Sequence, residues 1–544
     1  MGEHELEGQL MERFQPLLTD DTEVITNSYV SDVTLGSGKT LALITLDNGK
    51  DHTRPNTLGP QTLLQFAATL DELKQRATNK EIHAVAVTGK PYYLAAGADL
   101  SKVQQIKARQ VGRLIAELGH YALEKLDDLG VPSFVFINGL ALGGGLEVAL
   151  NANYRTVNSA APAIALPEVF LGLIPGWGGA YLLPNLIGIR NALKVIIENP
   201  LKQNRMLKPQ EVLELGIADV MFDSPRFLEE SLAWADQVLN GKKIKRKNEP
   251  GKVEKATVWS PAVAIARKTV QQKLGSVPLS PYAALDLIDA AKSGSKADAF
   301  KREDQAIEDL IASDQFRASI YSFNLVQKHA KNPSGAPDKK LAVPVTKVGV
   351  LGAGLMASQF ALLFLRRLEV PVVITDVSQE RIDKGISYII NELDKLVEKG
   401  RLSTDDRNRY AGNISGSLDY AAFSDCDWVI EAVFEELKIK QDVFAELEKH
   451  VSENCILATN TSSLSVEQIA SKLQKPERVV GFHFFNPVAV MPLVEVVRAP
   501  KSSDEAVATA MNVAKNLKKT AVITADAAGF VVNRLLGYLL GEAM

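Results

Sequence analysis

The segment that most constrains the fold is residues 347–367, KVGVLGAGLMASQFALLFLRR, which lies past the middle of the chain. An apolar run typical of a buried strand leads into a turn containing Gly352 and Gly354, and an apolar helical run follows. The next apolar run, PVVIT, comes just before Asp376. A strand, a glycine turn, a helix and a strand in this order form a βαβ unit, which belongs to a parallel sheet covered by helices. The sequence therefore predicts an α/β domain in the C-terminal half.

The glycine turn also predicts a binding site for a dinucleotide. The first glycine permits a tight turn, the second lets a pyrophosphate approach, and Ala357 takes the third position, where the helix packs on the strand. Asp376 follows the second strand, where a carboxylate hydrogen-bonds the adenosine ribose hydroxyls and repels a 2′-phosphate. We therefore predict that the cofactor is NAD rather than NADP.

Length and local composition divide the chain. A chain of 544 residues is too long for a single core, because domains usually contain about 100 to 200 residues. Buried strands are predicted at Leu41–Leu46, Ala84–Val87 and Phe134–Ile137, a solvated connector at residues 242–255, helices over 260–330, and a polar boundary at 331–340. We predict an α/β domain at residues 1–225, a helical linker region at 226–340, the dinucleotide domain at 341–526 and the start of a helical domain at 527–544.

The bulk composition is that of a soluble globular protein, with 46% hydrophobic and 23% charged residues. A net charge of −4 provides no broad positive field, so no nucleic acid is expected as a partner. Cys426 and Cys455 cannot form a disulfide framework or a metal knuckle, and they fit a reducing cytoplasm. The start of the chain, MGEHELEGQLMERF, lacks a signal-peptide pattern, and no apolar run approaches the roughly 18 residues that span a bilayer. We expect a cytoplasmic protein with no metal site and no transmembrane segment.

A helix start rich in glycine is the first candidate site. Gly143–Gly145 run into the apolar helical pattern GLEVAL. Without side chains there, the free N–H groups and the dipole of the helix start can face a developing negative charge. A second N–H near Ala98, in the turn of AAGADL, would complete a pair of donors. Such a pair suits the enolate oxygen of a thioester, where one preorganised donor is worth about 3 kcal/mol.

Two glutamates lie close to these donors in the sequence. Glu147 is one turn into the helix, and Glu168 follows Pro167 at the start of another segment. Both stand in apolar stretches, where a carboxylate is costly unless it is used or paired. One glutamate can position and deprotonate water while the other gives a proton to carbon. The spacing alone leaves open that both are capping or ion-paired residues.

Together these segments resemble the crotonase superfamily of enoyl-CoA hydratases and isomerases, across roughly residues 30 to 225. The resemblance implies a crotonase-like domain of spiral ββα units that binds acyl-CoA thioesters. Having both glutamates favours hydratase activity and leaves Δ3,Δ2-enoyl isomerisation open as a second activity. By position, the family's oxyanion donors correspond to Ala98 and Gly144, its water-holding groups to Gly176 and Glu147, and its proton donor to Glu168.

The C-terminal half contains the parts of an alcohol-oxidising site. The stretches ATNTSSL, GFHFFNPVAVMPLVEV and AGFVVNRLL contain Ser462, His483, Glu495 and Asn533. A histidine can take the hydroxyl proton, a carboxylate twelve residues further on can orient the imidazole, and Ser and Asn can position the oxygen. Because His483 follows an apolar strand, a histidine satisfied within the core is the alternative.

From about Val345 to the end, the sequence resembles the L-3-hydroxyacyl-CoA dehydrogenase family, on the motifs NTSS and HFFNPV in particular. The resemblance implies a Rossmann fold that binds NAD. It implies a catalytic set of Ser462, His483, Glu495 and Asn533, and a cofactor site made of Gly352, Gly354, Leu355, Met356, Asp376, Glu435 and Lys440.

The order of hydratase, helical linker and dehydrogenase resembles the multifunctional α chain of fatty-acid β-oxidation. That resemblance implies hydration of trans-2-enoyl-CoA, oxidation of the L-3-hydroxy product by NAD, a thiolase subunit as partner, and an oligomer in the full-length form. Such chains continue into further helical domains, so we expect a C-terminally truncated form here. One alternative is therefore a hydratase or isomerase only, whose dehydrogenase half binds NAD but is inactive through truncation. A scaffold without catalysis is disfavoured, because both glutamates and the histidine are present.

Overall fold

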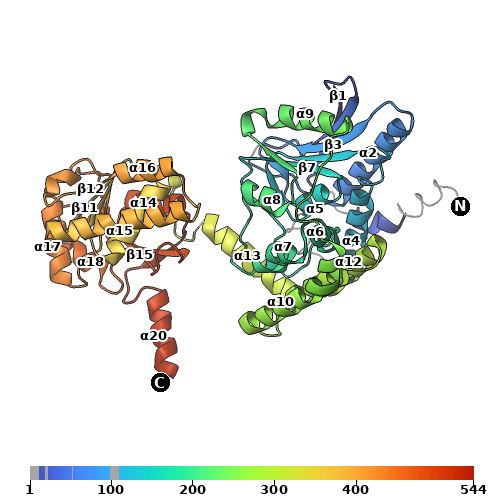
Figure 1. Cartoon of the computed structure of the whole chain (residues 1–544). Helices are drawn as coiled ribbons and strands as arrows, with labels where there is room; N and C mark the ends of the chain where they lie inside the picture. Colours follow the sequence, from blue (N-terminus) through green and yellow to red (C-terminus); the bar gives the residue numbers. More distant parts are fainter. Residues whose placement is uncertain (1–11, 19–22, 52, 99–108, 332, 544) are drawn as a thin grey trace. The chain divides into compact units, whose positions relative to one another are not determined.

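The computed structural model describes residues 12–18, 23–51, 53–98, 109–331 and 333–543. The chain forms two compact units, Met1–Phe323 and Asn324–Met544 (Figure 1). The first eleven residues, on which the expected absence of a signal peptide mostly depends, lie outside the described residues. Asp99 and Leu100 of the AAGADL motif also lie outside them.

The first unit contains two sheets. The larger sheet has six strands in the order β1-β2-β3-β5-β7-β9, and all of its neighbouring strands are parallel except β1 and β2. The smaller sheet, β4-β6-β8, is parallel. The strands are β1 (Asn27–Thr34), β2 (Thr40–Asp47), β3 (Ala84–Gly89), β4 (Tyr93–Ala95), β5 (Ser133–Ile137), β6 (Leu140–Leu142), β7 (Tyr154–Asn158), β8 (Ile164–Ala165) and β9 (Val220–Phe222). The three predicted buried strands are confirmed as β2, β3 and β5, and the last two are buried along their whole length.

Helices cover these sheets and fill the space around them (Figure 1). They are α2 (Pro60–Thr78), α4 (Arg109–Glu124), α5 (Gly144–Leu150), α6 (Gly179–Ile187), α7 (Ile189–Leu193), α8 (Pro209–Leu215) and α9 (Phe227–Leu239). The short helical turns are η1 (Gln15–Leu17), η2 (Glu168–Leu171), η3 (Lys194–Glu198), η4 (Ser224–Arg226) and η5 (Glu254–Val258).

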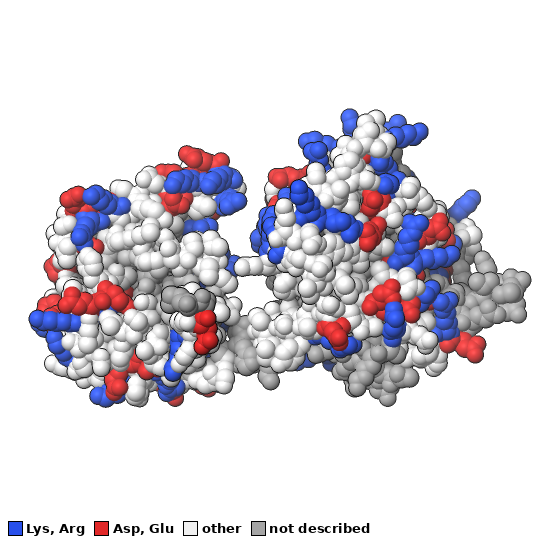
Figure 2. Space-filling view, turned by 90° about the horizontal axis from the view of Figure 1, so that it is seen from below, with Lys and Arg blue, Asp and Glu red and all other residues white. Residues whose placement is uncertain are grey.

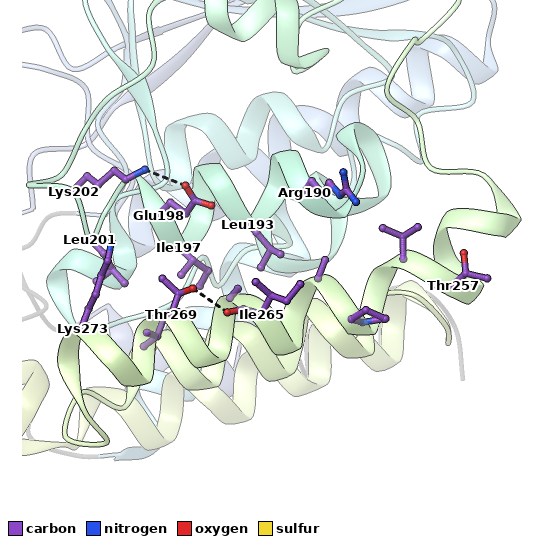
Figure 3. A pocket seen from close by; sticks show the side chains of 15 residues that line it. Arg190, Leu193, Ile197, Glu198, Leu201, Lys202, Thr257, Ile265, Thr269 and Lys273 are labelled. Carbon is purple, nitrogen blue, oxygen red and sulfur yellow. Dashed lines mark hydrogen bonds and ion pairs between the residues drawn. The ribbon is translucent and has the colours of Figure 1, made fainter.

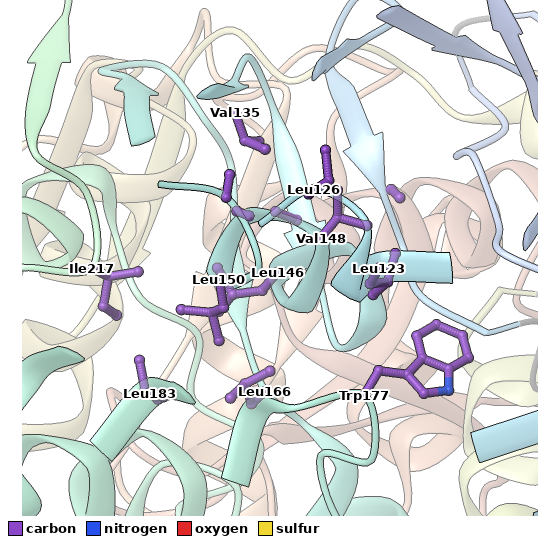
Figure 4. Close-up of a cluster of buried hydrophobic side chains, with 14 of the residues drawn as sticks. Leu123, Leu126, Val135, Leu146, Val148, Leu150, Leu166, Trp177, Leu183 and Ile217 are labelled. Carbon is purple, nitrogen blue, oxygen red and sulfur yellow. The ribbon is translucent and has the colours of Figure 1, made fainter. Parts of the chain in front are cut away.

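Helix α5 lies in the middle of the core. All seven of its residues are buried. Its Leu146, Val148 and Leu150 belong to a cluster that also contains Leu123 and Leu183 (Figure 4). A helix that is buried all round offers no solvated face. A carboxylate on this helix is therefore removed from bulk water, and it has to be stabilised by protein groups.

The helices predicted for residues 260–330 are confirmed, and most of them pack on the first unit. They are α10 (Trp259–Leu274), α11 (Ser280–Ala290), α12 (Lys296–Ile311) and α13 (Asp314–Lys331). Trp259, Ile288 and Leu310 belong to the same core cluster as α5. Most of the region predicted as a linker is thus part of the first compact unit, because its apolar stripes are buried against that core.

The charged stretch at residues 242–255, predicted as a solvated connector, is mostly exposed but anchored at two points. Arg246 contacts Asp219 at 2.9 Å, and the carboxylate of Glu254 accepts a hydrogen bond from the N–H of Ile189 at 2.9 Å.

A groove of about 620 Å³ runs between α10 and the α7–η3 segment (Figure 3). Apolar side chains such as Leu193, Ile197 and Ile265 line it, together with the basic Arg190 and Lys273. None of the predicted site residues lies in its wall.

The second unit is a doubly covered α/β sheet, as predicted. Its order is β12-β11-β10-β13-β14-β15-β16-β17. The six strands from β12 to β15 are parallel, β16 is antiparallel to β15, and β17 is parallel to β16. The strands are β10 (Val348–Leu351), β11 (Val372–Thr375), β12 (Ile414–Gly416), β13 (Trp428–Glu431), β14 (Ile456–Thr459), β15 (Val479–Phe484), β16 (Leu493–Arg498) and β17 (Thr520–Ala525).

Alternate residues of each strand point to opposite faces, and each face has its own apolar cluster. Val348 and Val350 pack with Phe360 of α14, whereas Leu351 packs with Phe444 of α17. The helices are α14 (Leu355–Arg367), α15 (Gln379–Glu398), α16 (Thr404–Gly412), α17 (Leu437–Leu447), α18 (Val466–Ile469), α19 (Asp504–Asn516) and α20 (Val532–Ala543). The short turns are η6 (Lys339–Leu341), η7 (Tyr420–Phe423), η8 (Ala470–Lys472) and η9 (Pro476–Arg478).

Within the described residues, no helix is long and apolar enough to cross a membrane. On the face shown in Figure 2, basic and acidic side chains are interspersed.

We predict that the packing of α10 stabilises the first unit. Trp259 is fully buried, and its indole N–H donates to the carbonyl of Ile288 at 2.8 Å. Trp259→Ala should reduce the free energy of unfolding by about 3 to 5 kcal/mol, because it leaves a cavity and removes the indole hydrogen bond.

Chemical unfolding followed by circular dichroism measures this loss. The matched control is Ile265→Ala on the same helix, where the side chain is 69% exposed and the change should stay within about 0.5 kcal/mol. Equal effects of the two substitutions would show that α10 does not pack as described.

Candidate active sites

Glu147 lies in the first turn of α5 with a side chain that is only 2% exposed. One of its oxygens, Oε1, accepts hydrogen bonds from the backbone N–H groups of Trp177 at 2.8 Å and Gly179 at 2.9 Å. Burial, followed by the charge of Glu303, raises the pKa of Glu147 to about 7, although these two hydrogen bonds oppose the shift. Burial and the two backbone donors therefore act on the pKa of this carboxyl in opposite directions.

Glu168 approaches the same end of α5 from η2. Its Oε1 lies 2.5 Å from the point where a β-carbon on Gly143 would stand, so only glycine allows this approach. Its Oε2 is buried and has no hydrogen-bond partner among the described residues. Burial and the nearby charge of Glu147 raise the pKa of Glu168 well above its ordinary value. The structure therefore brings the two predicted glutamates together.

The turn before Ala98 lies against the start of α5, which begins at Gly144. Gly144 is the first residue of α5, so its N–H has no partner within the helix. Gly97 has φ +78°, and a β-carbon there would lie 3.0 Å from the nitrogen of Gly144. The turn that ends in Ala98 thus packs directly against the helix start. Bulkier residues would push the two N–H groups apart.

Gly176 differs from its prediction in one respect. The hydrogen bonds to Glu147 come from the following loop residues, Trp177 and Gly179, and among the described residues none runs from the N–H of Gly176 to either glutamate. A role of Gly176 in holding water stays a prediction. The sequence PGWGGA indicates such a loop, because its glycines allow several N–H groups to point to one side.

Sequence reasoning missed a buried cluster next to Glu147. His120 of α4 contacts Asp304 at 2.8 Å and Glu303 at 3.1 Å, both on α12, and all three side chains are buried. Glu303 also accepts the N–H of Gly178 at 2.7 Å. The helical pattern of KADAFKREDQAIEDLI does not distinguish these two buried carboxylates from the exposed charges around them.

In the second unit, the predicted cofactor residues lie where parallel strands end. Gly352 follows β10 with φ +108°, and a β-carbon there would lie 2.9 Å from the carbonyl oxygen of Ala432. Gly354 caps α14 and has open space around it. Leu355 and Met356 form the first turn of α14. Ligands of open α/β sheets bind at the carboxyl ends of the strands where the strand order reverses, which here is between β10 and β13.

Asp376 follows β11 at the same edge of the sheet. Its carboxylate accepts the N–H of Ala353 at 2.8 Å and the N–H of Val377 at 2.7 Å. Arg381 lies 3.4 Å from Oδ1. The carboxylate is therefore tied to the glycine turn, with oxygen lone pairs left for a ribose hydroxyl.

Glu435 holds Ser462 in place. Its Oε1 accepts hydrogen bonds from the N–H of Ser462 at 2.7 Å and from the hydroxyl of Thr461 at 2.6 Å. The side chain of Lys440 is buried, with 1% of it exposed. Its ammonium pairs with Glu431 at 2.6 Å and with Glu435 at 3.1 Å. We propose that Lys440 acts on the cofactor site through Glu435, since its ammonium is enclosed by these two carboxylates.

His483 and Glu495 face each other across β15 and β16. They are register partners in the antiparallel pair, which explains why twelve residues separate them. The distance from Nδ1 to Oε2 is 2.7 Å, and the other carboxylate oxygen accepts the N–H groups of Val531 and Val532 at 3.0 Å each. Burial raises the pKa of Glu495, but the hydrogen bonds from His483, Val532 and Val531 outweigh it and lower the pKa below its ordinary value.

Asn533 completes this arrangement, because its amide donates to the carbonyl of Ser462 at 3.3 Å. The start of α20 therefore contacts both Glu495 and the Ser462 loop. The four predicted residues Ser462, His483, Glu495 and Asn533 are brought together by these contacts.

Comparison with known families assigns a class to each unit. The family model described as enoyl-CoA hydratase/isomerase matches residues 36–257, and that of the NAD-binding domain of 3-hydroxyacyl-CoA dehydrogenase matches residues 347–527. The chain is thus a crotonase-type domain followed by a Rossmann-type NAD-binding domain. The predicted fold class and the NAD cofactor are confirmed.

The fatty acid oxidation complex subunit alpha of Shewanella amazonensis is 31% identical over 510 residues, which are 92% of this chain and 70% of that protein. The chain belongs to this family of fatty acid oxidation complex alpha subunits.

Two solved structures are similar to the second unit in sequence. The (S)-3-hydroxybutyryl-CoA dehydrogenase of Ralstonia eutropha is 35% identical, with 37% of this chain and 70% of that chain covered and a TM-score of 0.36. The 3-hydroxybutyryl-CoA dehydrogenase of Escherichia coli K12 is 34% identical, with 37% and 42% covered and a TM-score of 0.36.

The position of Asp376 predicts the cofactor preference. The intact chain should bind NADH much more tightly than NADPH, because the carboxylate repels a 2′-phosphate. Asp376→Ala should reduce the ratio of the dissociation constant of NADPH to that of NADH by about tenfold or more, equivalent to about 1.4 kcal/mol. It removes the repulsion and frees Arg381 to pair with the phosphate.

Isothermal titration calorimetry gives both constants. Asp383→Ala, an exposed aspartate on α15, is the matched control and should keep the wild-type ratio. An unchanged ratio in Asp376→Ala would remove Asp376 from cofactor recognition.

Proposed function

We propose that the first unit hydrates trans-2-enoyl-CoA with Glu147 and Glu168. The observation that carries this proposal is the pair of buried carboxylates at the glycine-rich start of α5. Glu147 takes a proton from water as the water oxygen attacks Cβ of the enoyl group. Glu168 gives a proton to Cα. The N–H groups of Ala98 and Gly144 hold the thioester oxygen as it gains negative charge.

The environments of the two glutamates support this division of roles. Glu147 is held by two backbone donors, which favour its carboxylate form. The buried Oε2 of Glu168 has no partner among the described residues, which favours a carboxyl that carries a proton. Pairs of acids whose surroundings push their pKa values apart can serve as base and acid at one pH.

We further propose that the second unit oxidises the L-3-hydroxyacyl-CoA product. His483 takes the hydroxyl proton, and Glu495 stabilises the resulting imidazolium and fixes its orientation. Ser462 and Asn533 position the substrate oxygen. Gly352, Gly354 and Asp376 would hold NAD, which would supply the hydride acceptor for C3 of the substrate. The product of the first site is therefore the substrate of the second, in β-oxidation.

The relative named above is a subunit of a complex, which supports a partner for this chain. We propose that the partner is a thiolase, because cleavage of a 3-ketoacyl-CoA consumes the product of the second site. Assembly into an oligomer is part of the same proposal. Cytoplasmic location is proposed as well, since Cys426 and Cys455 are buried free thiols.

A second candidate function is hydration alone, with a dehydrogenase half that binds NAD but turns over poorly. The observation that favours it lies on α20, where Leu535, Tyr538 and Leu539 are each more than 60% exposed. This helix begins at the catalytic set, so apolar side chains beside that set are open to water. NADH formation from 3-hydroxybutyryl-CoA decides between the two candidates.

Substitution of either glutamate should abolish hydration. We predict that Glu147→Gln and Glu168→Gln each lower kcat for crotonyl-CoA hydration by about 10²- to 10⁴-fold, because each amide loses acid–base function. The loss of enoyl-CoA absorbance measures the rate. Glu214→Gln, an exposed glutamate on α8, is the control and should keep wild-type activity. Near-normal hydration by either site variant would exclude that glutamate from the mechanism.

Substitution in the second unit should affect oxidation only. We predict that His483→Gln lowers NADH formation from 3-hydroxybutyryl-CoA by about 10²- to 10⁴-fold, while hydration and NADH binding stay unchanged. His450→Gln, in the turn after α17, is the matched control. Retention of wild-type oxidation by His483→Gln would leave His483 as a core histidine.

A further inference from the structure

Three consecutive N–H groups in the loop after Gly176 point at two different carboxylates. Trp177 and Gly179 donate to Glu147, at 2.8 Å and 2.9 Å, and Gly178 between them donates to Glu303 at 2.7 Å. The middle contact thus fixes the loop segment whose neighbours hold Glu147. A shift of Gly178 would move both of the donors beside it.

Glu303 is itself held from the opposite side. His120 contacts Glu303 at 3.1 Å and Asp304 at 2.8 Å, and its ring stacks on Phe300 with centroids 4.1 Å apart. Burial disfavours the charged imidazole, but the hydrogen bonds to Asp304 and Glu303 outweigh it and raise the pKa of His120 to about 9. Burial raises the pKa of Glu303, and the hydrogen bond and charge of His120 oppose that shift by favouring the carboxylate.

We propose that Glu303 is a positioning residue for hydration, which fixes the Trp177–Gly179 loop on Glu147. This inference rests on the proposed role of Glu147 as the base. Glu303 does not touch the reacting atoms in this account, and it acts through the loop and through its electric field.

Glu303 lies in the helical region that follows the crotonase-type domain. The hydratase/isomerase family model ends at residue 257, whereas Glu303 and Asp304 lie on α12. Helix α12 packs along α4, which carries His120. The helical region after the crotonase-type domain therefore supplies a part of the hydration site and not only a connection to the second unit.

The sign of the electrostatic effect follows from the groups that face Glu147. These are Glu303 on α12, His120 on α4 and Glu168 on η2. The charge of Glu303 raises the pKa of Glu147, and that of His120 lowers it. Removing the charge of Glu303 should therefore lower the pKa of Glu147, so that the base stays ionised at lower pH.

Two substitutions separate the charge from the hydrogen bond. Glu303→Gln keeps an oxygen that can accept the N–H of Gly178 but removes the charge. We expect the acidic limb of kcat/KM for crotonyl-CoA hydration to move to lower pH by about one unit. Glu303→Ala removes both, and we expect kcat to fall by about 10- to 100-fold with little change in KM, because the loop is displaced. Recovery of kcat in the Gln variant relative to the Ala variant is the signature of positioning.

Glu308→Gln is the matched control, since Glu308 also lies on α12 and pairs with α4 through Arg113 at 3.3 Å. Its pH profile and kcat should equal those of the wild type. Identical pH profiles of Glu303→Gln and Glu308→Gln, or a kcat of Glu303→Ala within twofold of the wild type, would overturn the proposal. If the Ala variant does not fold, the pH profile of the Gln variant still decides.

The failure of this inference is distinguishable from failure of the proposed function. If Glu147→Gln hydrates normally, Glu147 is not the base and the proposed function fails. If Glu147→Gln is inactive while both Glu303 variants behave like Glu308→Gln, only the positioning role of Glu303 is wrong.

Discussion

The structure of the first site depends on one buried carboxylate, that of Glu147, being held by backbone N–H groups. Helix α5 is enclosed on all sides, so an ionised group on it cannot be solvated by bulk water. The hydrogen bonds from Trp177 and Gly179 replace that solvation. Close packing explains why glycines stand at the helix start, because β-carbons on Gly143, Gly144 and Gly145 would each collide with neighbouring atoms. Close packing thus brings Glu147, Glu168 and the turn at Gly97 together at the start of α5.

The second site uses the same physical device on an unrelated sheet. Glu495 is fully buried, and it accepts the N–H groups of Val531 and Val532 on one oxygen and His483 on the other. In both units a carboxylate is withdrawn from water, stabilised by two backbone donors, and left with one defined task. We propose that for Glu147 this task is to take a proton from water. We propose that for Glu495 it is to orient a histidine that takes a proton from an alcohol.

Much of this arrangement could be predicted from the sequence, since it depends on local patterns. The strands, the glycine turn at Gly352 and the carboxylate at Asp376 are encoded within short segments, and the resemblance to known families identified Glu147, Glu168 and His483. Contacts between distant segments could not be predicted in this way. The run KREDQ shows five polar residues, and helical periodicity alone does not indicate that Glu303 and Asp304 face His120, 183 and 184 residues earlier in the chain. For the same reason residues 226–340 were predicted as a linker region, although α10 to α12 are packed into the core.

The most direct test of the account is a single reaction with crotonyl-CoA and NAD as the only substrates. The presence of two sequential sites predicts that the wild-type chain consumes the enoyl-CoA and then forms NADH. It also predicts that Glu147→Gln forms no NADH from crotonyl-CoA but does form NADH from 3-hydroxybutyryl-CoA. Absence of NADH from wild-type chain that hydrates crotonyl-CoA would contradict the claim of two sequential sites, and NADH formation from crotonyl-CoA by Glu147→Gln would contradict the assignment of the first.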